Sequence, residues 1–353
     1  MTHKQFLSIA VAAAMAAPLA AQAGVKLTGT IQGELGHVEV GGGDGFTTST
    51  DSTGALGAGG GPNKVRFDVS EDLGGGLQAF GRADWGFNLT TSKNSSNLTD
   101  REKFVGIKSS SGAYLRFGRI QGAYKTATKI DPFYSTGAQM RCAGGESCGS
   151  GFTHSSFLNN IFEIGFKNSG FKLALQGILD ESTDAAGDSL YNDGSFLADV
   201  EYGNDMFTVF GAYSQISTDD DPANWKVGGK FSMGGLTLGL QYEDAEMDTY
   251  NGGAALKSMG SMQGQFAAGS ASYKIGNAIL AGWVSQYMDD EEMKSDARTS
   301  GDTIGYSVGA IYLFGKNTIA YAAYHATDSD SKVGGNEDAY DWNAFAAGIR
   351  HSF

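Results

Sequence analysis

The sequence predicts an all-β protein, a transmembrane β-barrel of roughly sixteen antiparallel strands whose third long loop folds inward. Three observations predict this fold. Apolar and polar residues alternate with period two over much of the chain, short turns alternate with long polar connections, and an export signal precedes a chain with no further helix-length apolar run. Period-two alternation is the pattern of a strand with one apolar face and one wet face.

Residues 1–23 have the pattern of a secretory signal peptide, and residues 24–353 are predicted to form one barrel domain. Lys4 supplies the positive start, an Ala-rich apolar run follows, and Ala21 and Ala23 mark a small-x-small cleavage site. No other apolar run reaches the ~18 residues that a membrane-spanning helix needs. The signal therefore leaves a secreted protein, a periplasmic protein or an outer-membrane barrel.

The composition favours the barrel among these three. The chain has 53 glycines against 4 prolines, with 11% aromatic and 18% charged residues. Glycine at this frequency without a G-X-Y period is not collagen, and 41% hydrophobic residues argue against a disordered linker. Many short strands joined by glycine turns account for it. The formal net charge of −14 argues against nucleic acid as a partner.

The predicted strands follow one another as alternating segments. In residues 25–40, Val25 and Leu27 share one face while Lys26 and Glu34 lie on the other. The same alternation predicts strands at residues 64–69, 77–87, 160–167, 171–176, 196–202, 207–213, 225–231, 236–242 and 304–314. Each has one apolar and one polar face, as a barrel wall between lipid and water requires.

The connections predict how the strands are joined. Short turns are predicted at residues 71–76, 109–112, 168–170, 203–205, 232–235, 274–277 and 315–317. Longer polar connections are predicted at residues 41–62, 91–100, 120–154, 181–195, 217–222, 244–261, 288–301 and 328–341. Short and long connections alternate strictly, which places the turns in the periplasm and the loops outside, and gives an even strand number.

The third long connection, residues 120–154, organises the rest of the chain. Connections longer than ~12–15 residues are uncommon and usually functional. This one carries Asp131 in an Asp-Pro-Phe turn, both cysteines of the chain, Cys142 and Cys148, and Glu146 between them. We expect it to fold into the barrel and to narrow the lumen.

The chain resembles a general porin of the Gram-negative outer membrane. In the last predicted strand Phe345, Ile349 and Phe353 share one face, and Phe353 is the final residue. The stretches FDVSEDLGGGLQAF, at residues 67–80, and DREKFVGIKSSSGAYLRFGRIQGAYKTATKIDPF, at residues 100–133, resemble the second hairpin of the family and the strand pair that feeds its constriction loop. The likeness covers the mature chain in architecture and is dense in motifs only over residues 64–133 and at the terminus.

The resemblance implies a homotrimer in the outer membrane of a Gram-negative bacterium, in contact with membrane lipid and lipopolysaccharide. Each barrel would be a water-filled channel for small hydrophilic solutes, and the barrel-assembly machinery would read Phe353 in the last strand. The resemblance also implies a basic ladder on the barrel wall that faces acidic residues of the inward loop. The ladder residues are Arg66, Arg82, Arg101 and Arg116, and the acidic residues are Asp131 and Glu146.

Cys142 and Cys148 have two interpretations, a disulfide or a metal site. Two thiols with no histidine nearer than His154 fall short of a closed zinc site, and an exported chain favours the disulfide. No Ser/His/Asp signature surrounds the histidines, so we expect neither an enzyme nor a metal centre. No cofactor is expected beyond weak binding of divalent cations at acidic outer loops, such as the one containing residues 219–221.

Three functional classes remain open. The first is a passive diffusion channel for ions and small hydrophilic solutes, with the lumen narrowed by the third loop. The second is a channel selective for a sugar or an anion, indicated only by Tyr124, Phe133 and Tyr134 in that loop. The third is a non-conducting adhesin or structural barrel, which would need a longer plug than this loop provides.

Overall fold

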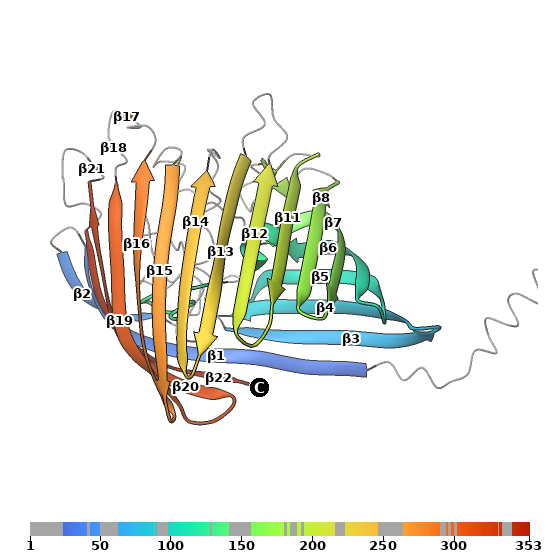
Figure 1. Cartoon of the computed structure of the whole chain (residues 1–353), viewed down its shortest axis with the longest axis horizontal. Coiled ribbons are helices and arrows are strands. Elements are labelled where there is room, and N and C mark those ends of the chain that lie inside the picture. Colours follow the sequence, from blue (N-terminus) through green and yellow to red (C-terminus); the bar gives the residue numbers. More distant parts are fainter. Residues whose placement is uncertain are drawn as a thin grey trace, which may run out of the picture.

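The protein is a closed antiparallel β-barrel (Figure 1). The computed structural model describes residues 24–40, 43–49, 63–87, 89, 98–127, 129–140, 157–179, 182–183, 189–191, 194–215, 223–245, 264–289, 294–295, 298–299, 302–330, 332–333 and 341–353. The predicted signal peptide, Cys142, Glu146 and Cys148 lie outside these residues.

Sixteen strands form the barrel wall. They are β1 (Gly24–Val40), β3 (Lys64–Gly74), β4 (Leu77–Phe87), β5 (Leu98–Ser109), β6 (Ala113–Gln121), β7 (Phe157–Asn168), β8 (Phe171–Ile178), β11 (Phe196–Gly203), β12 (Phe207–Gln215), β13 (Ala223–Met233), β14 (Leu236–Ala245), β15 (Gly264–Ile275), β16 (Ala278–Asp289), β19 (Thr303–Leu313), β20 (Thr318–Ser329) and β22 (Trp342–Ser352). The predicted antiparallel barrel of sixteen strands is confirmed.

The first and last strands close the barrel. β1 pairs with β22 from Thr30 opposite Ser352 to Val40 opposite Trp342. Gly29 and Phe353 exchange backbone hydrogen bonds of 2.9 and 3.1 Å next to this ladder. A Cβ atom at Gly29 would lie 2.4 Å from Cζ of Phe353, so glycine is needed where the terminal ring crosses β1. Closure leaves no open sheet edge in the wall.

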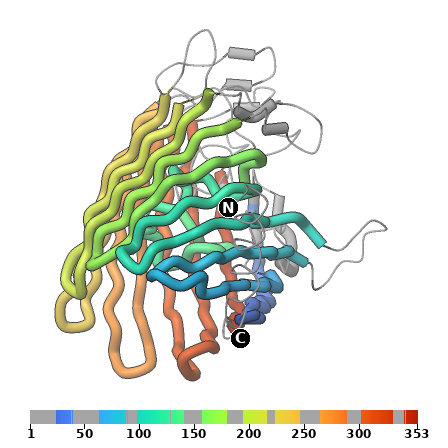
Figure 2. Tube along the Cα trace, turned by 90° about the vertical axis from the view of Figure 1, so that its right-hand side faces the viewer, coloured from blue at the N-terminus to red at the C-terminus, as the bar shows by residue number. Residues whose placement is uncertain are grey.

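The tight turns gather at one end of the barrel, the lower end in Figures 1 and 2. They lie between consecutive wall strands, as the predicted alternation of short and long connections requires. Positive φ angles at Gly74, Gly75 and Gly76 show why glycine occupies the first turn. Two to four residues separate the wall strands at each of these turns, and the long connections join the strands at the opposite end.

The structure changes some boundaries. The third long connection spans residues 122–156 rather than 120–154, because β6 continues to Gln121 and β7 begins at Phe157. β5 begins at Leu98, inside the connection expected at residues 91–100. β2 (Gly43–Ser49) pairs with the outer half of β1, where only a loop was expected.

Five very short strands lie in the long connections. β9 (Ser182–Thr183) pairs with β10 (Ser189–Tyr191). β17 (Lys294–Ser295), β18 (Arg298–Thr299) and β21 (Lys332–Val333) form a separate small sheet. This second pairing joins two connections that are distant in sequence.

The wall is apolar outside and polar inside, the reverse of a water-soluble barrel. On β5 and β6, Val105 and Phe117 are 65% and 47% exposed on the outward face, whereas Glu102 on the inward face of β5 is buried. The exposed residues follow the predicted period of two. Such an outward apolar band is what contact with lipid requires.

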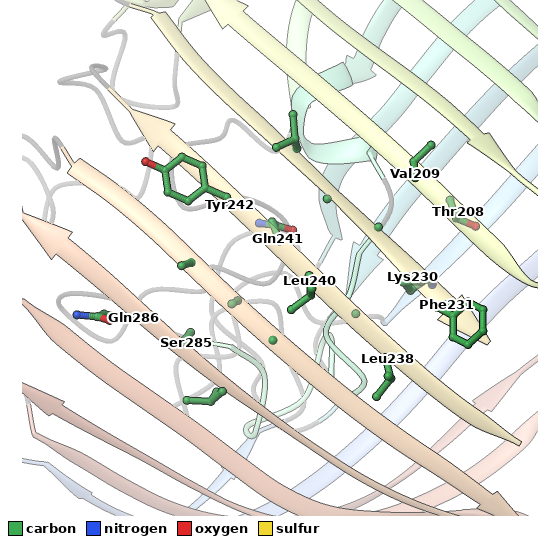
Figure 3. A pocket seen from close by; sticks show the side chains of 18 of the residues that line it. Thr208, Val209, Lys230, Phe231, Leu238, Leu240, Gln241, Tyr242, Ser285 and Gln286 are labelled. Atoms are coloured by element: carbon green, nitrogen blue, oxygen red, sulfur yellow. The ribbon is translucent and has the colours of Figure 1, made fainter. Parts of the chain in front are cut away.

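One outward hollow of about 1020 Å³ lies over β12–β16 and β19 (Figure 3). Its rim includes Leu238 and Leu240, and Leu240 is 71% exposed. Gly269 lies opposite both Leu240 and Val284 in the strand registers, so the floor has no side chain there. The hollow opens on the apolar outside and is separate from the polar interior.

The helix in the described part of the chain is short and lies in the interior of the barrel. α2 (Ala123–Thr126) follows β6, and the buried side chains of residues 123–140 pack with inward apolar residues of several strands into one cluster. No helix in the described part of the chain is long and apolar enough to cross a membrane.

Candidate pore constriction

Residues 122–140, here called the inner segment, are attached first to the wall next to β6. The backbone N–H of Ala123 donates to Gln176 on β8 at 2.7 Å. The hydroxyl of Thr126 donates to Asp199 on β11 at 2.8 Å. These bonds fix the first turn of the segment, where the N–H groups of a helix lack partners within the helix.

The inner segment is also bonded to strands much farther along the chain. Tyr124 donates its hydroxyl hydrogen to Glu243 on β14 at 2.6 Å. Ser270 on β15 donates to the carbonyl of Ile130 at 2.7 Å. The indole N–H of Trp283 on β16 donates to the carbonyl of residue 138 at 2.9 Å. Each wall residue lies on the inward face of its strand.

A third set of contacts comes from the closure of the barrel. The carboxylate of Glu34 on β1 accepts hydrogen bonds from the N–H of Gly137 at 2.9 Å and from the hydroxyl of Tyr321 at 2.6 Å. Gln32 and Arg350 both donate to the carbonyl of Ser135, at 2.9 and 2.8 Å. The inner segment therefore has polar contacts with inward side chains around much of the barrel.

Asp131 shapes the inner segment from within. One carboxylate oxygen accepts the N–H of Phe133 at 2.8 Å, and the other accepts the N–H of Met140 at 2.8 Å. The carboxylate thereby links both ends of the turn region. Satisfying buried N–H groups in this way stabilises an irregular backbone that forms few ladder bonds.

Five cations on β3–β6, here called the basic strip, lie on the inward side of the wall. They are Lys64, Arg66, Arg82, Arg101 and Arg116. All four predicted ladder arginines are brought together in this strip, with Lys64 added. The inward faces of Arg66, Arg82 and Arg116 agree with the period-two prediction.

Carboxylates on neighbouring strands neutralise part of the strip. Arg66 contacts Asp84 at 2.6 Å, and Arg82 contacts Asp68 at 2.7 Å and Glu102 at 2.8 Å. A register shift between β4 and β5 allows Asp84 to accept the N–H of Glu102 as well, at 2.8 Å. Such a bulge redirects side chains locally.

The other arginines of the strip have different surroundings. Arg116 forms a bidentate pair with Glu163 on β7, at 2.9 and 2.8 Å. Arg101 lies 3.7 Å from Asp84. Arg119 lies outside the strip, directly opposite Lys103 on β5, and donates to Asn159 at 2.6 Å. The guanidinium groups of Arg101 and Arg119 both lie over the ring of Phe157. The ring contributes a cation–π contact to each.

The expected opposition of wall arginines and loop acids takes a different form in the described residues. The carboxylates that pair with the strip are Asp68, Asp84, Glu102 and Glu163, all from wall strands. Both oxygens of Asp131 accept N–H groups of the inner segment itself. The pairing of adjacent strands alone brings their carboxylates within reach of an arginine. A carboxylate in a loop reaches the same arginine only if the path of the loop brings it there.

Four lysines, here called the lysine group, surround α2. They are Lys125 and Lys129 of the inner segment, Lys172 of β8 and Lys226 of β13. The pKa of Lys125 is lowered to about 7, first by burial and then by the charges of Arg101 and Lys226. The pKa of Lys129 is also lowered to about 7, first by burial and then by the other three lysines, while Asp199 acts in the opposite direction.

The aromatic residues of the inner segment mostly serve packing. Tyr124 and Phe133 are each 1% exposed and belong to the apolar cluster. The ring of Tyr134 lies 5.0 Å from the ammonium of Lys129. In the described ranges no group of three or more His, Cys, Asp or Glu side chains is placed to hold a metal ion.

Sequence reasoning missed the lysine group and the anchors Glu34, Glu243 and Tyr321. The strand residues among them lie on the polar faces that period two predicts, so the sequence pattern predicts that their side chains point inward. Their contacts with the inner segment join residues up to 119 positions apart for Tyr124 and Glu243. No local pattern encodes such a pairing.

Comparisons with known proteins agree with this architecture. A family model described as Gram-negative porin matches residues 8–344. An outer membrane porin protein of Bordetella pertussis is 26% identical over 318 residues, which is 80% of each chain. An anion-selective porin from Comamonas acidovorans superposes with a TM-score of 0.64 at 18% identity, covering 94% of this chain and 100% of that one.

OmpF of Salmonella typhi, solved in complex with daunomycin, superposes with a TM-score of 0.67 at 15% identity, covering 93% of this chain and 97% of that one. At such identities the superpositions establish the fold alone, while the family model covers nearly the whole chain. The closed barrel, its apolar outside and this match lead to one conclusion: the chain belongs to the Gram-negative porin family and is a diffusion channel of the outer membrane.

Proposed function

We propose that this channel passes ions and small hydrophilic solutes passively and that the inner segment forms its narrowest passage. The observation that supports this most strongly is the set of hydrogen bonds from Gln176, Glu243 and Glu34 to the segment. These three residues lie on β8, β14 and β1, which are well separated around the wall. A segment held from several directions narrows the lumen without a plug.

The charge of the interior favours anions over cations. The basic strip has five cations against the four carboxylates paired with it, and the lysine group adds positive charge from another direction. An ion within a few ångströms of these groups experiences them with little screening by salt. Selectivity for a sugar is less well supported, because Tyr124 and Phe133 are buried in the apolar cluster.

Planar-bilayer recording of the purified full chain tests this function. In a gradient of KCl we expect stepwise conductance and a reversal potential of the sign that chloride permeation gives. Neutral solutes of increasing size should enter until the passage excludes them. Absence of any conductance from a correctly folded barrel would contradict the proposed channel, and a cation-selective reversal potential would contradict the charge assignment alone.

We propose further that three copies associate, with their outward apolar faces against one another and against lipid and lipopolysaccharide. No catalytic activity forms part of this proposal. Residues 1–23 would direct export and then be removed. Cys142 and Cys148 would form a disulfide and Glu146 would approach the passage; mass spectrometry of the mature, non-reduced protein would identify both the cleavage site and the disulfide.

Phe353 is proposed to be the residue that the barrel-assembly machinery recognises. Its ring lies beside Gly29 at the closing ladder, and its side chain remains 48% exposed. Deletion of Phe353 should reduce the amount of protein in the outer membrane and increase it in the periplasm, while the purified chain still refolds in detergent. Unchanged outer-membrane levels would contradict the recognition role.

A further inference from the structure

The lysine group brings four ammonium groups from three separate elements to one place inside the barrel. Lys129 donates to the carbonyl of Lys125 at 2.9 Å, which holds its chain along α2. Lys172 approaches the same turn from β8 and donates to the carbonyl of Thr126 at 3.2 Å. Lys226 approaches from β13, with its ammonium 4.6 Å from the centre of the Tyr124 ring. The loop and two distant strands thus converge.

Two carboxylates face this group from the described strands. Asp199 pairs with Lys172 at 3.1 Å and accepts the hydroxyl of Thr126, and Glu243 accepts the hydroxyl of Tyr124. Glu163 is also near Asp199, but it forms the bidentate pair with Arg116. Counted over the residues that the structure describes, four ammonium groups against Asp199 and Glu243 leave an excess of about two positive charges when every lysine is protonated.

We propose that the lysine group binds a small divalent oxyanion with the charge and size of sulfate or hydrogen phosphate. This inference rests on the proposed function, because solutes reach the site through an open lumen. An anion of charge −2 compensates the excess that Asp199 and Glu243 leave. Its several oxygens can accept hydrogen bonds from ammonium groups that arrive from different directions, which chloride cannot match.

The four lysines differ in solvent exposure, so one side of the site is open to water and the other is buried. Lys125 and Lys226 are 7% and 1% exposed, whereas the side chain of Lys172 is 22% exposed and Lys129 is half-buried. An anion would therefore enter past Lys129 and Lys172. Partial desolvation strengthens its attraction to the buried charges behind them.

Proton linkage gives this site a signature that a uniformly positive wall lacks. The lowered pKa values of Lys125 and Lys129 reflect burial and repulsion from Arg101, Lys172 and Lys226. A bound anion opposes that repulsion and favours the protonated amines, so binding takes up protons near pH 7. Affinity must therefore rise as the pH falls.

Sulfate is the probe, because its charge stays at −2 between pH 6 and pH 8. We expect sulfate to reduce the KCl current of single channels, with the half-blocking concentration roughly tenfold lower at pH 6 than at pH 8 for each lysine whose protonation binding requires. Isothermal calorimetry of the detergent-solubilised full chain with sulfate provides a second readout that needs no conduction. Both should show the same dependence on pH.

Three variants separate the site from general electrostatics. Lys129→Gln should weaken sulfate binding and flatten its pH dependence, while Lys129→Arg should retain binding with a flatter pH profile because arginine stays charged. Lys230→Gln, on the same strand and face as Lys226 but two inward positions away, should behave as the unsubstituted chain. Barrels are compared only after heat-dependent gel migration shows that each variant is folded.

The outcomes distinguish this inference from the proposed function. KCl conductance with no sulfate block and no calorimetric binding would overturn the oxyanion site and leave the channel intact. Binding that does not change with pH, or that Lys230→Gln weakens as much as Lys129→Gln, would also overturn it. Calorimetric binding by a folded barrel that conducts nothing would support the site and contradict the proposed channel.

Discussion

Two groups of cations face the interior, the basic strip on β3–β6 and the lysine group around α2, and their surroundings differ. In the strip, Arg66, Arg82 and Arg116 are paired with carboxylates from adjacent strands, and both partners are positioned by the sheet. In the lysine group, Lys125 and Lys129 belong to an irregular segment whose position depends on contacts with distant strands.

This difference determines how each group responds to its environment. Guanidinium groups remain protonated throughout the physiological range, so the charge of the arginines in the strip is set by the sequence. Desolvated amines with pKa values near 7 gain or lose protons in that range. The arginines of the strip therefore make a permanent contribution to selectivity, and the lysine group makes an adjustable one.

The largest expected effect comes from neutralising the strip. Arg66→Gln combined with Arg82→Gln leaves the carboxylates of Asp84 and Glu102 without their closest cations. Removing two charges about 8 Å from a permeating ion changes its energy by about 1 kcal/mol in water before screening. We expect a roughly threefold shift of the chloride-to-potassium permeability ratio toward potassium after salt screens part of this.

Reversal potentials in a KCl gradient measure that shift. Lys316→Gln provides the control, because it removes a charge from the turn between β19 and β20, away from the basic strip. An unchanged ratio in the double variant would mean that ions do not pass the strip. A shift of equal size in Lys316→Gln would mean that net charge, rather than position, determines selectivity.

The sequence predicted the strip better than the lysine group for a physical reason. Arg66, Arg82 and Arg116 lie in strands, where a period of two assigns each side chain to a face. Their partners were not predictable, because Asp84 meets Glu102 only through a register shift between β4 and β5. The alternation of turns and connections predicted the strand order for the same local reason.

The sequence of the inner segment has no regular alternation of apolar and polar residues from which its path could be predicted. Its path depends on Glu34, Gln176 and Glu243, which are 53 to 119 residues away in sequence from the residues that they bond. Asp131 was predicted to face the wall arginines, but a carboxylate beside a turn is equally suited to accept nearby N–H groups. Only the folded barrel determines which of these occurs.

The second expected effect is a response of selectivity to pH. A lysine is charged below its pKa, so lowering the pH from 8 to 6 takes groups with pKa values near 7 from roughly one-tenth to roughly nine-tenths protonated. Lys125 and Lys129 then gain positive charge together. We expect chloride preference to rise by roughly twofold, less than the change from the double arginine variant.

Reversal potentials at pH 6, 7 and 8 test this response. In Lys125→Gln combined with Lys129→Gln the dependence on pH should weaken markedly, because the two groups with pKa values near 7 are absent. The arginine double variant should retain it on a shifted baseline. A pH response that survives in the lysine variant would assign it to groups outside α2 and would remove the contrast between the two regions.

The smallest expected effect concerns the attachment of the inner segment to the far wall. Tyr124→Phe removes the hydroxyl that donates to Glu243 at 2.6 Å but keeps the ring against the ammonium of Lys226. Loss of one hydrogen bond to a buried carboxylate costs about 1–3 kcal/mol locally. The other anchors, including Glu34 to Gly137, should hold the segment in place. Mean conductance and selectivity should therefore change little, while the open-channel current becomes noisier as the turn at α2 detaches more often.

Tyr306→Phe, on the outward face of β19, is the matched control and should leave the noise unchanged. Because the lysine group depends on this turn for the position of Lys125 and Lys129, the pH response should weaken in Tyr124→Phe as the noise rises. Noise without a weaker pH response would show that the two lysines keep their position independently of the Tyr124 anchor.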